Sequence, residues 1–255
     1  MRAIRAIAVN TFREAIRDRI LYLFVGFAVV LVVSTKLFGM LTVGDETRIV
    51  KDIGLASMQF FSMLIAVMMS MLLVSREVES RTVFNILSKP VRRWQFLVGK
   101  YLGLLAIVAA NLVFITTVLM VMVVIYTGQM DLMLLFCACM TMLEMAVLAA
   151  FAILFAVLTK PILGSLMTLA VFFVGHMSAD LWMLAQQIPG TMTRSIIAVV
   201  YYLVPNLERF DFRTEVVHDL PIPAAAVGWA VIYAAAFAAV ILFLASLRFQ
   251  SKDLR

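Results

Sequence analysis

A series of long apolar segments separated by short polar ones is the feature that most constrains how this chain can fold. Hydrophobic residues make up 64% of the 255 residues and charged residues only 14%, whereas soluble domains are about half apolar and about a quarter charged. About 20 apolar residues in a helix cross the hydrocarbon core of a membrane. We therefore expect an all-α integral membrane protein with room for about six spans.

The apolar segments and the polar segments between them divide the chain into expected elements. Within a single transmembrane domain, residues 1–255, we expect six transmembrane helices at residues 20–43, 52–74, 96–126, 132–158, 162–185 and 224–247. The more polar segment 186–223 has an apolar run at 196–204, which is about half the length that crosses a membrane. We expect 186–223 to form an external cap, with Tyr201 and Tyr202 at the outer interface, where amphipathic rings concentrate.

Residues 3–18 have the pattern of an amphipathic helix. Successive residues of a helix are rotated by about 100°, which places Ile4, Ala8 and Phe12 on one side and polar residues such as Arg13 on the other. We expect this helix to lie in the membrane surface with its basic side toward anionic headgroups. The alternative is an ordinary cytoplasmic helix packed on other protein.

The basic residues predict the orientation of the chain, because they are retained on the cytoplasmic side of a membrane. One side of the expected map holds fifteen of them: Arg2, Arg5, Arg13, Arg17, Arg19, Arg76, Arg81, Lys89, Arg92, Arg93, Lys100, Lys160, Arg248, Lys252 and Arg255. The other side holds six: Lys36, Arg48, Lys51, Arg194, Arg209 and Arg213. Both termini and the loop 75–95 are therefore expected in the cytoplasm. The net charge of +6 is explained by topology and does not indicate a nucleic-acid partner.

The loop 75–95 is the longest polar interruption of the chain and also its most basic part. It begins with alternating charges, typical of an exposed helix end, and continues with a short apolar helical turn that Pro90 ends. We expect an amphipathic helix held outside the membrane and suited to docking another protein. Its contact residues are expected to be Glu77, Glu79, Arg81, Val83, Phe84 and Leu87.

Three segments of the chain resemble a known family. They are NTFREAIRDRILY near the start, REVESRTVFNILSKPVRRWQFLVGKYLG in the middle and YYLVPNLERFDF, which contains Pro205 and Asn206, near the end. Together they resemble the permease subunit of type-two ABC exporters and are most similar to the NosY-like branch, named for multicopper-enzyme maturation. The resemblance implies six spanning helices, a multi-pass permease homodimer in the cytoplasmic (inner) membrane of a bacterium or archaeon, and a coupling helix within 75–95.

The resemblance also implies a separate ATP-binding cassette ATPase subunit, which would hold ATP and Mg, and it leaves room for a periplasmic or external accessory protein. The sequence itself contains no phosphate-binding loop, because Gly99-Lys100 has Trp94 where such a loop needs its first glycine. We therefore expect no catalytic residue and no cofactor in this chain. Gly99 and Gly103 form a GxxxG pattern, which is either a close-packing face or incidental.

Ionisable residues inside the expected spans are candidates for a substrate path, since burying a charge there costs at least ~2.5 kcal/mol. Glu144 lies in the fourth span, and His176 and Asp180 lie four residues apart in the fifth, where they would share a helix face. They predict either a polar cavity or a proton relay. The structural alternative is that Glu144 pairs with a neighbouring helix and that Asp180 marks a break in the fifth helix.

Two further classes of function remain beside the ABC permease. One is a secondary transporter in which Glu144, His176 and Asp180 relay protons, and the other is an intramembrane hydrolase, for which the sequence has neither an HExxH helix nor a GxSxG turn. Methionine and cysteine cluster in the second and fourth expected spans, and such soft ligands suit cuprous ions. Methionine also fills apolar cores, and the spacing favours no ligand set, so we expect no metal site.

Overall fold

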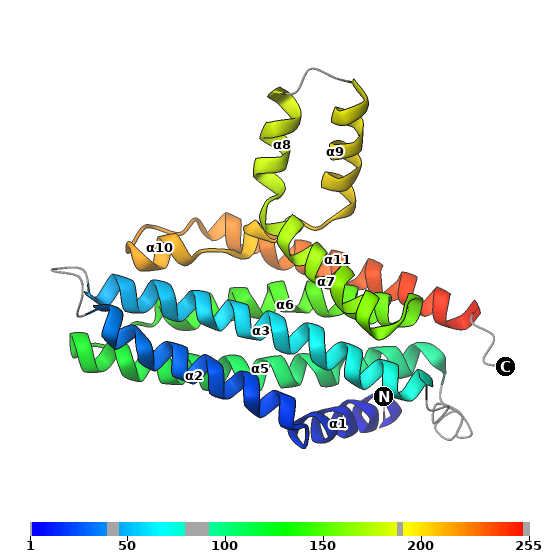
Figure 1. The fold of residues 1–255 in the computed structure, drawn as a ribbon, viewed down its shortest axis with the longest axis horizontal. Coiled ribbons are helices and arrows are strands. Elements are labelled where there is room, and N and C mark those ends of the chain that lie inside the picture. The colour runs from blue at the N-terminus through cyan, green and yellow to red at the C-terminus, as the bar shows by residue number, and fades with distance from the viewer. Residues whose placement is uncertain (1, 40–45, 80–91, 188–190, 252–255) are drawn as a thin grey trace.

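The computed structural model describes residues 2–39, 46–79, 92–187 and 191–251. Within these residues the chain forms helices and turns and contains no strand, and most of the long helices run side by side (Figure 1). The elements are α1 (Arg2–Ile16), α2 (Arg19–Gly39), α3 (Glu46–Glu79), α5 (Arg93–Thr127), α6 (Met133–Leu158), α7 (Pro161–His176), α8 (Ser178–Gln187), α9 (Thr191–Leu203), the 3-10 helix η1 (Glu208–Phe210), α10 (Arg213–Val217) and α11 (Ala224–Ser251).

Four of the described helices are long and apolar enough to cross a membrane. Their apolar parts are Thr47–Leu73, Arg93–Thr127, Met133–Leu158 and Ala224–Phe249. The chain is therefore an all-α, multi-pass integral membrane protein. The other two expected spans correspond to shorter apolar helices, Arg19–Thr35 and Pro161–His176, and a total of six spans stays a prediction.

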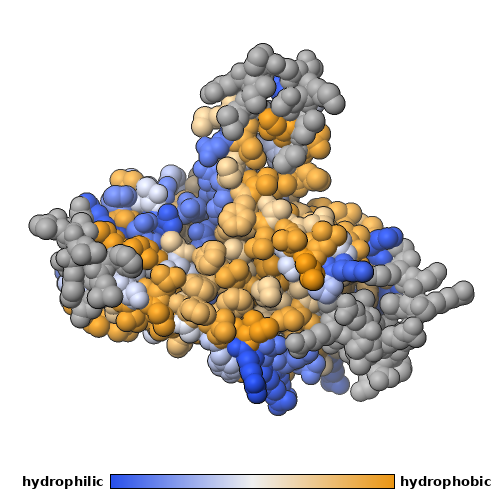
Figure 2. All heavy atoms as spheres, viewed as in Figure 1, coloured by the Kyte–Doolittle hydropathy of each residue, from blue (hydrophilic) through white to orange (hydrophobic). Residues whose placement is uncertain are grey.

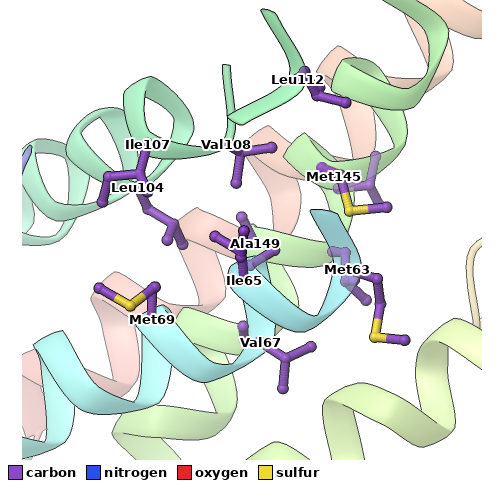
Figure 3. Close-up of a cluster of buried hydrophobic side chains, with 14 of the residues drawn as sticks. Met63, Ile65, Val67, Met69, Leu104, Ile107, Val108, Leu112, Met145 and Ala149 are labelled. Atoms are coloured by element: carbon purple, nitrogen blue, oxygen red, sulfur yellow. The ribbon is translucent and has the colours of Figure 1, made fainter. Parts of the chain in front are cut away.

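The helix α6 lies at the centre of the bundle, where it packs against α3, α5, α7 and α11. The close-up in Figure 3 shows side chains of α3, including Met63 and Ile65, facing Val108 of α5 and Met145 of α6. All four are at most 1% exposed. Flexible methionine side chains fill the gaps between branched ones, so this close-packed layer fixes how α3, α5 and α6 lie against one another.

Helix α1 packs along the first turns of α5 through Gly99 and Gly103. A Cβ atom added to Gly103 would lie 2.5 Å from Cβ of Thr11, and one added to Gly99 would lie 2.8 Å from Cβ of Ile7. Since such distances leave no space for a side chain, the GxxxG pattern is a close-packing face, and the helix that it accommodates is α1. Whether α1 also lies in a membrane surface stays a prediction.

Two expected boundaries differ from the structure. The helix α3 continues to Glu79, so Glu77 and Glu79 belong to a helix and not to a loop that begins at residue 75. The single helix expected over 162–185 is divided, because α7 ends at His176 and α8 begins at Ser178. At this break Leu207 donates its backbone N–H to the carbonyl oxygen of Gly175 at 3.1 Å, so the returning chain takes the hydrogen bond that a continuing helix would use.

The segment 186–223, expected to be a cap, contains three described helices. The helices α8 and α9 form a hairpin that projects sideways from the bundle, and η1 and α10 lie over α3 and α6 near one end of it (Figure 1). At the opposite end lie the start of α1, the end of α3, the start of α5 and the end of α11. The helices next to both termini and the two flanks of the loop 75–95 therefore share one end of the bundle.

Candidate polar site between α3, α6 and α7

Two polar side chains inside the bundle meet because they are equally far from one turn. The helices α6 and α7 are joined by the tight turn at Thr159 and Lys160. Glu144 lies 14 residues before the end of α6 and His176 lies 15 residues after the start of α7, so both are ~21–23 Å from the turn at 1.5 Å per residue. Antiparallel neighbours of equal depth face each other.

Gln59 of α3 completes the cluster. Its side-chain Nε2 donates to Oε2 of Glu144 at 2.9 Å and lies 3.0 Å from Nε2 of His176. The same imidazole nitrogen is 3.4 Å from Oε1 of Glu144. The side chain of Glu144 is 1% exposed and that of His176 is 21% exposed. Three helices are thus joined by one buried polar cluster, Gln59–Glu144–His176, inside an otherwise apolar core.

The hydrogen bonds assign the tautomer of His176. Its Nδ1 lies 3.0 Å from the carbonyl oxygen of Phe172, which only accepts, so Nδ1 carries a proton. In the neutral ring Nε2 is then an acceptor, and it takes the second N–H of the Gln59 amide. Every donor of Gln59 is thereby used, which explains why an uncharged amide occupies the centre of the cluster.

The same geometry offers a second arrangement. If His176 gains a proton at Nε2, this nitrogen becomes a donor and can no longer accept from Gln59. Its remaining acceptor is Oε1 of Glu144, for which the described residues provide no other hydrogen-bond donor. One proton therefore exchanges a bond between α3 and α7 for a bond between α6 and α7, at the point where α7 ends.

A small cavity lies between Gln59 of the cluster and the η1–α10 segment at one end of the bundle. A cavity of about 10 Å³ lies beside Gln59 and Thr141 and is bounded by Phe210, Asp211 and Arg213 of the η1–α10 segment. This volume holds about one water molecule. Phe210 and Phe212 also line this cavity and are 2% and 8% exposed, so both rings are packed inside the protein.

Ion pairs at the same end join the elements around this cavity. Lys51 of α3 lies 2.6 Å from Asp131 in the turn between α5 and α6, and 3.8 Å from Asp219 after α10. Arg213 of α10 lies 3.0 Å from Asp52. These contacts hold the η1–α10 segment over the start of α3.

The structure brings only some of the sequence candidates together. Glu144 and His176 are in contact, whereas Asp180 lies on α8, exposed and beyond the break, and it is not among the described partners of His176. The helical pair of His176 and Asp180 is therefore replaced by a pair between helices. Gln59 was missed, although an amide within the apolar run of α3 was a signal that could have found it.

The other candidates lie outside this site. Tyr201 and Tyr202 of α9 pack on Trp182 of α8 with ring centroids 4.9 and 6.4 Å apart. Pro205 is buried, and the backbone N–H of Asn206 donates to the Tyr233 hydroxyl at 2.8 Å. Among the coupling candidates, the side chains of Glu77 and Glu79 and the whole of Arg81, Val83, Phe84 and Leu87 lie outside the described residues.

The described residues contain no group of three or more histidine, cysteine, aspartate or glutamate side chains that could hold a metal ion. Cys137 is buried and Cys139 is exposed, and both are free thiols.

A comparison with family models matches residues 5–254 to the family described as "ABC-2 family transporter protein". A comparison with curated proteins finds no match.

Proposed function

Because the chain belongs to the ABC-2 transporter family, we propose that it is the permease subunit of an ATP-driven exporter in a bacterial or archaeal cytoplasmic membrane. The family makes it a permease of an ABC transporter, which is a transport component and not itself an enzyme. Within this proposal the substrate leaves the cytoplasm, the energy comes from ATP bound with Mg on a separate ATPase subunit, and both termini are cytoplasmic. The observation that carries the proposal is the family match over residues 5–254.

The proposed position of the ATPase is the loop 75–95. The described flanks of this loop, α3 and α5, end and begin beside the start of α1 (Figure 1), where the basic residues are concentrated. Closure of the ATPase can move the permease only through a contact that differs between two states. We assign this contact to the apolar side chains Val83, Phe84 and Leu87, with Glu77, Glu79 and Arg81 setting its orientation through charge pairs.

Replacing Phe84 tests this assignment. Buried aromatic anchors often contribute about 2 kcal/mol or more to an interface, so we expect Phe84→Ala to reduce the amount of ATPase that co-purifies with the chain by at least about tenfold. Phe243→Ala is the control, because Phe243 of α11 is 62% exposed and lies far from residue 84 in sequence. If Phe84→Ala leaves co-purification unchanged while deletion of residues 2–16 abolishes it, the coupling element lies elsewhere.

We further propose that two copies of the chain form the permease, because an ATP-binding cassette engine closes as a dimer and one copy supplies one coupling loop. Close packing of helices is the basis of such interfaces in membranes. An accessory protein on the external side would meet the η1–α10 segment in this arrangement. A cysteine placed at the exposed Glu208 should then react with an impermeant thiol reagent on intact cells, and reaction only from the cytoplasmic side would reverse the proposed orientation.

The alternative, a secondary transporter with a proton relay, is favoured by one observation. Glu144 and His176 are in contact inside the bundle, and in the second arrangement of the cluster a proton on His176 would be hydrogen-bonded to Glu144. Asp180, the third member of the expected relay, does not join them. The family match favours ATP as the energy source, so we assign the cluster to the ABC permease, where it would stabilise the occluded state of the path.

A further inference from the structure

A second cavity lies between α1, α2 and α5, on the opposite side of the bundle from the η1–α10 segment. Its volume is about 270 Å³, and its wall includes Phe12 of α1, Val25 of α2 and Ala110 and Phe114 of α5. It is much larger than the cavity beside Gln59, and it contacts none of the three residues of the polar cluster. Nothing in the proposed permease mechanism uses it.

The local fold explains why this cavity exists. The helix α1 lies tightly on α5 as far as Thr11, which sits against Gly103. After Ile16 the chain turns, and the carboxylate of Asp18 accepts a hydrogen bond from the backbone N–H of Ile20 at 3.0 Å, which starts α2. The helix α2 then packs more extensively against α3 than against α5. The space between the diverging helices is the cavity.

The wall of the cavity is almost wholly apolar. The only polar side chains in it are Tyr22 and Asn111. Asn111 is 3% exposed, and its Nδ2 donates to Oγ of Ser62 on α3 at 3.0 Å, so this donor is directed to protein. Tyr22 is 59% exposed and lies near the start of α2. A wall of this kind suits a hydrocarbon chain and not a charged group.

At the end of the cavity where α1 meets α2, the side chains change from apolar to basic. Ile16 and Leu21 line the cavity, and the side chains of Arg17 and Arg19 between them in sequence are exposed. Figure 2 shows hydrophilic side chains gathered at the lower edge of the molecule, beneath the apolar surface of the long helices. An apolar cavity with two exposed arginines next in sequence to its lining residues matches the two-part chemistry of a lipid with an anionic headgroup.

We propose that this cavity binds one acyl chain of an anionic phospholipid from the leaflet next to α1, with the headgroup phosphate against Arg17 and Arg19. The volume lies just below the ~300 Å³ of the smallest ligand pockets, so it accommodates one chain and not a whole lipid. Such a lipid would fill the space between α1 and α5 and fasten the α1–α2 turn to the membrane. The proposal requires neither ATP nor transport.

Photolabelling tests where the acyl chain of the lipid inserts into the protein. The protein is placed in nanodiscs that contain phosphatidylglycerol with a diazirine at the end of one acyl chain, irradiated, digested and analysed by mass spectrometry. We expect labels concentrated on the peptides that contain Phe12, Val25 and Phe114. Ala110→Trp, which fills the cavity, should reduce these labels at least about fivefold, and Ala110→Leu should reduce them less.

The matched control is Ala106→Trp. Ala106 is exposed one turn earlier on the same helix and does not line the cavity, so this variant should label like the wild type. Labels spread evenly over the apolar faces of α2, α5 and α11, or labelling that both alanine-110 variants leave unchanged, would overturn the proposal. The readout is lipid labelling of this protein without its partners. The lipid proposal can therefore fail while the proposed permease function holds, and the permease function can fail while the lipid proposal holds.

A second comparison tests the headgroup. Phosphatidylglycerol should label the cavity about fivefold more strongly than a phosphatidylcholine probe with the same chain, because each arginine near a membrane surface favours an anionic lipid. Replacing Arg17 and Arg19 together by glutamine should remove this preference. Arg5→Gln, at an exposed arginine on α1 away from the cavity, should keep it. Equal labelling by the two lipids in the wild type would contradict the anionic part of the proposal.

Discussion

Two groups of polar side chains join helices of this bundle, and they differ mainly in burial. The Gln59–Glu144–His176 cluster lies in the apolar core, where the carboxylate is 1% exposed. At the η1–α10 end the pair of Arg213 and Asp52 is the open one, with side chains 36% and 50% exposed, whereas those of Lys51 and Asp131 are 10% and 18% exposed. The buried cluster is joined by the amide of Gln59, which bonds Oε2 of Glu144 and Nε2 of His176, whereas the outer group is joined by opposite charges.

This difference follows from the cost of removing a charge from water. A buried ion pair is costly to form, and losing one partner leaves an uncompensated group inside. An exposed pair contributes only about 0–1 kcal/mol because water and salt screen it. The buried cluster should therefore control the stability and state of the bundle, and the outer pairs should open more easily.

Removing the carboxylate of the buried cluster should have the largest effect. Glu144→Ala leaves an N–H of Gln59 without its acceptor, and a buried unsatisfied group costs about 1–3 kcal/mol. Adding the cavity left by the side chain, we expect a loss of about 3 kcal/mol, measured by thermal or denaturant unfolding in detergent, together with loss of transport. Glu144→Gln keeps the shape and should lose less stability. Equal stability of Glu144→Ala and the wild type would show that the cluster does not join the helices.

Disturbing the uncharged packing contact between α1 and α5 at Gly103 should have the next largest effect on stability. Gly103→Leu would push α1 away from α5, where an added Cβ already lies 2.9 Å from the backbone oxygen of Ala8, and overpacking typically costs about 1–3 kcal/mol. Gly228→Leu on α11 is the matched control, because nothing lies within 4 Å of its added Cβ. Protease protection of residues 2–16 should fall in the first variant only. Similar protection in both variants would contradict the close-packing role of Gly103.

Replacing Lys51 should have an intermediate effect on stability, because its ion pairs are less exposed than the pair of Arg213 and Asp52 but lie outside the buried cluster. Its side chain is 10% exposed and contacts two acidic residues, Asp131 and Asp219. We expect Lys51→Met to destabilise the protein by about 1–2 kcal/mol, between an exposed and a buried pair, and to increase the reactivity of a cysteine placed at Phe210. Unchanged reactivity would show that the ion pairs do not hold the η1–α10 segment closed.

The exposed pair should give the smallest effect. Arg213→Gln removes a contact to Asp52 that water already screens, so the loss should be about 0.5 kcal/mol or less and should disappear at 1 M salt. Unfolding midpoints of variant and wild type at low and high salt measure this. A loss of stability that persists in high salt would show that the Arg213 contact is not screened by water, and would contradict the contrast between the buried cluster and the exposed ion pairs.

The sequence predicted those parts of the fold that depend on local patterns. Long apolar runs predicted the four helices that are long and apolar enough to cross a membrane. The GxxxG pattern allowed two interpretations, a close-packing face or an incidental match, and the structure shows the close-packing face. The sequence offered a break of the fifth helix near Asp180 as an alternative, and the structure has the break after His176. Its position was not predictable in detail, because the break is accompanied by a hydrogen bond from Leu207, 32 residues away from Gly175 in sequence. Local apolar character alone would have continued the helix.

The candidate site was predictable in part for a similar reason. Glu144 and His176 stood out as ionisable residues in apolar runs, and their equal distance from the turn at Thr159 was available in the sequence. Helical spacing paired His176 with Asp180 instead, since that argument considers only one helix. Gln59 could be placed only once the packing of α3 against α6 was known, because it belongs to a separate part of the chain.

The composition of the complex that this chain forms tests the central claim most directly. The chain is purified through an affinity tag from its own membranes in mild detergent and analysed by native mass spectrometry. A permease subunit of an ATP-driven exporter should appear as two copies of the chain with two copies of an ATP-binding subunit. A chain that is recovered from these membranes without any ATPase subunit would contradict the account.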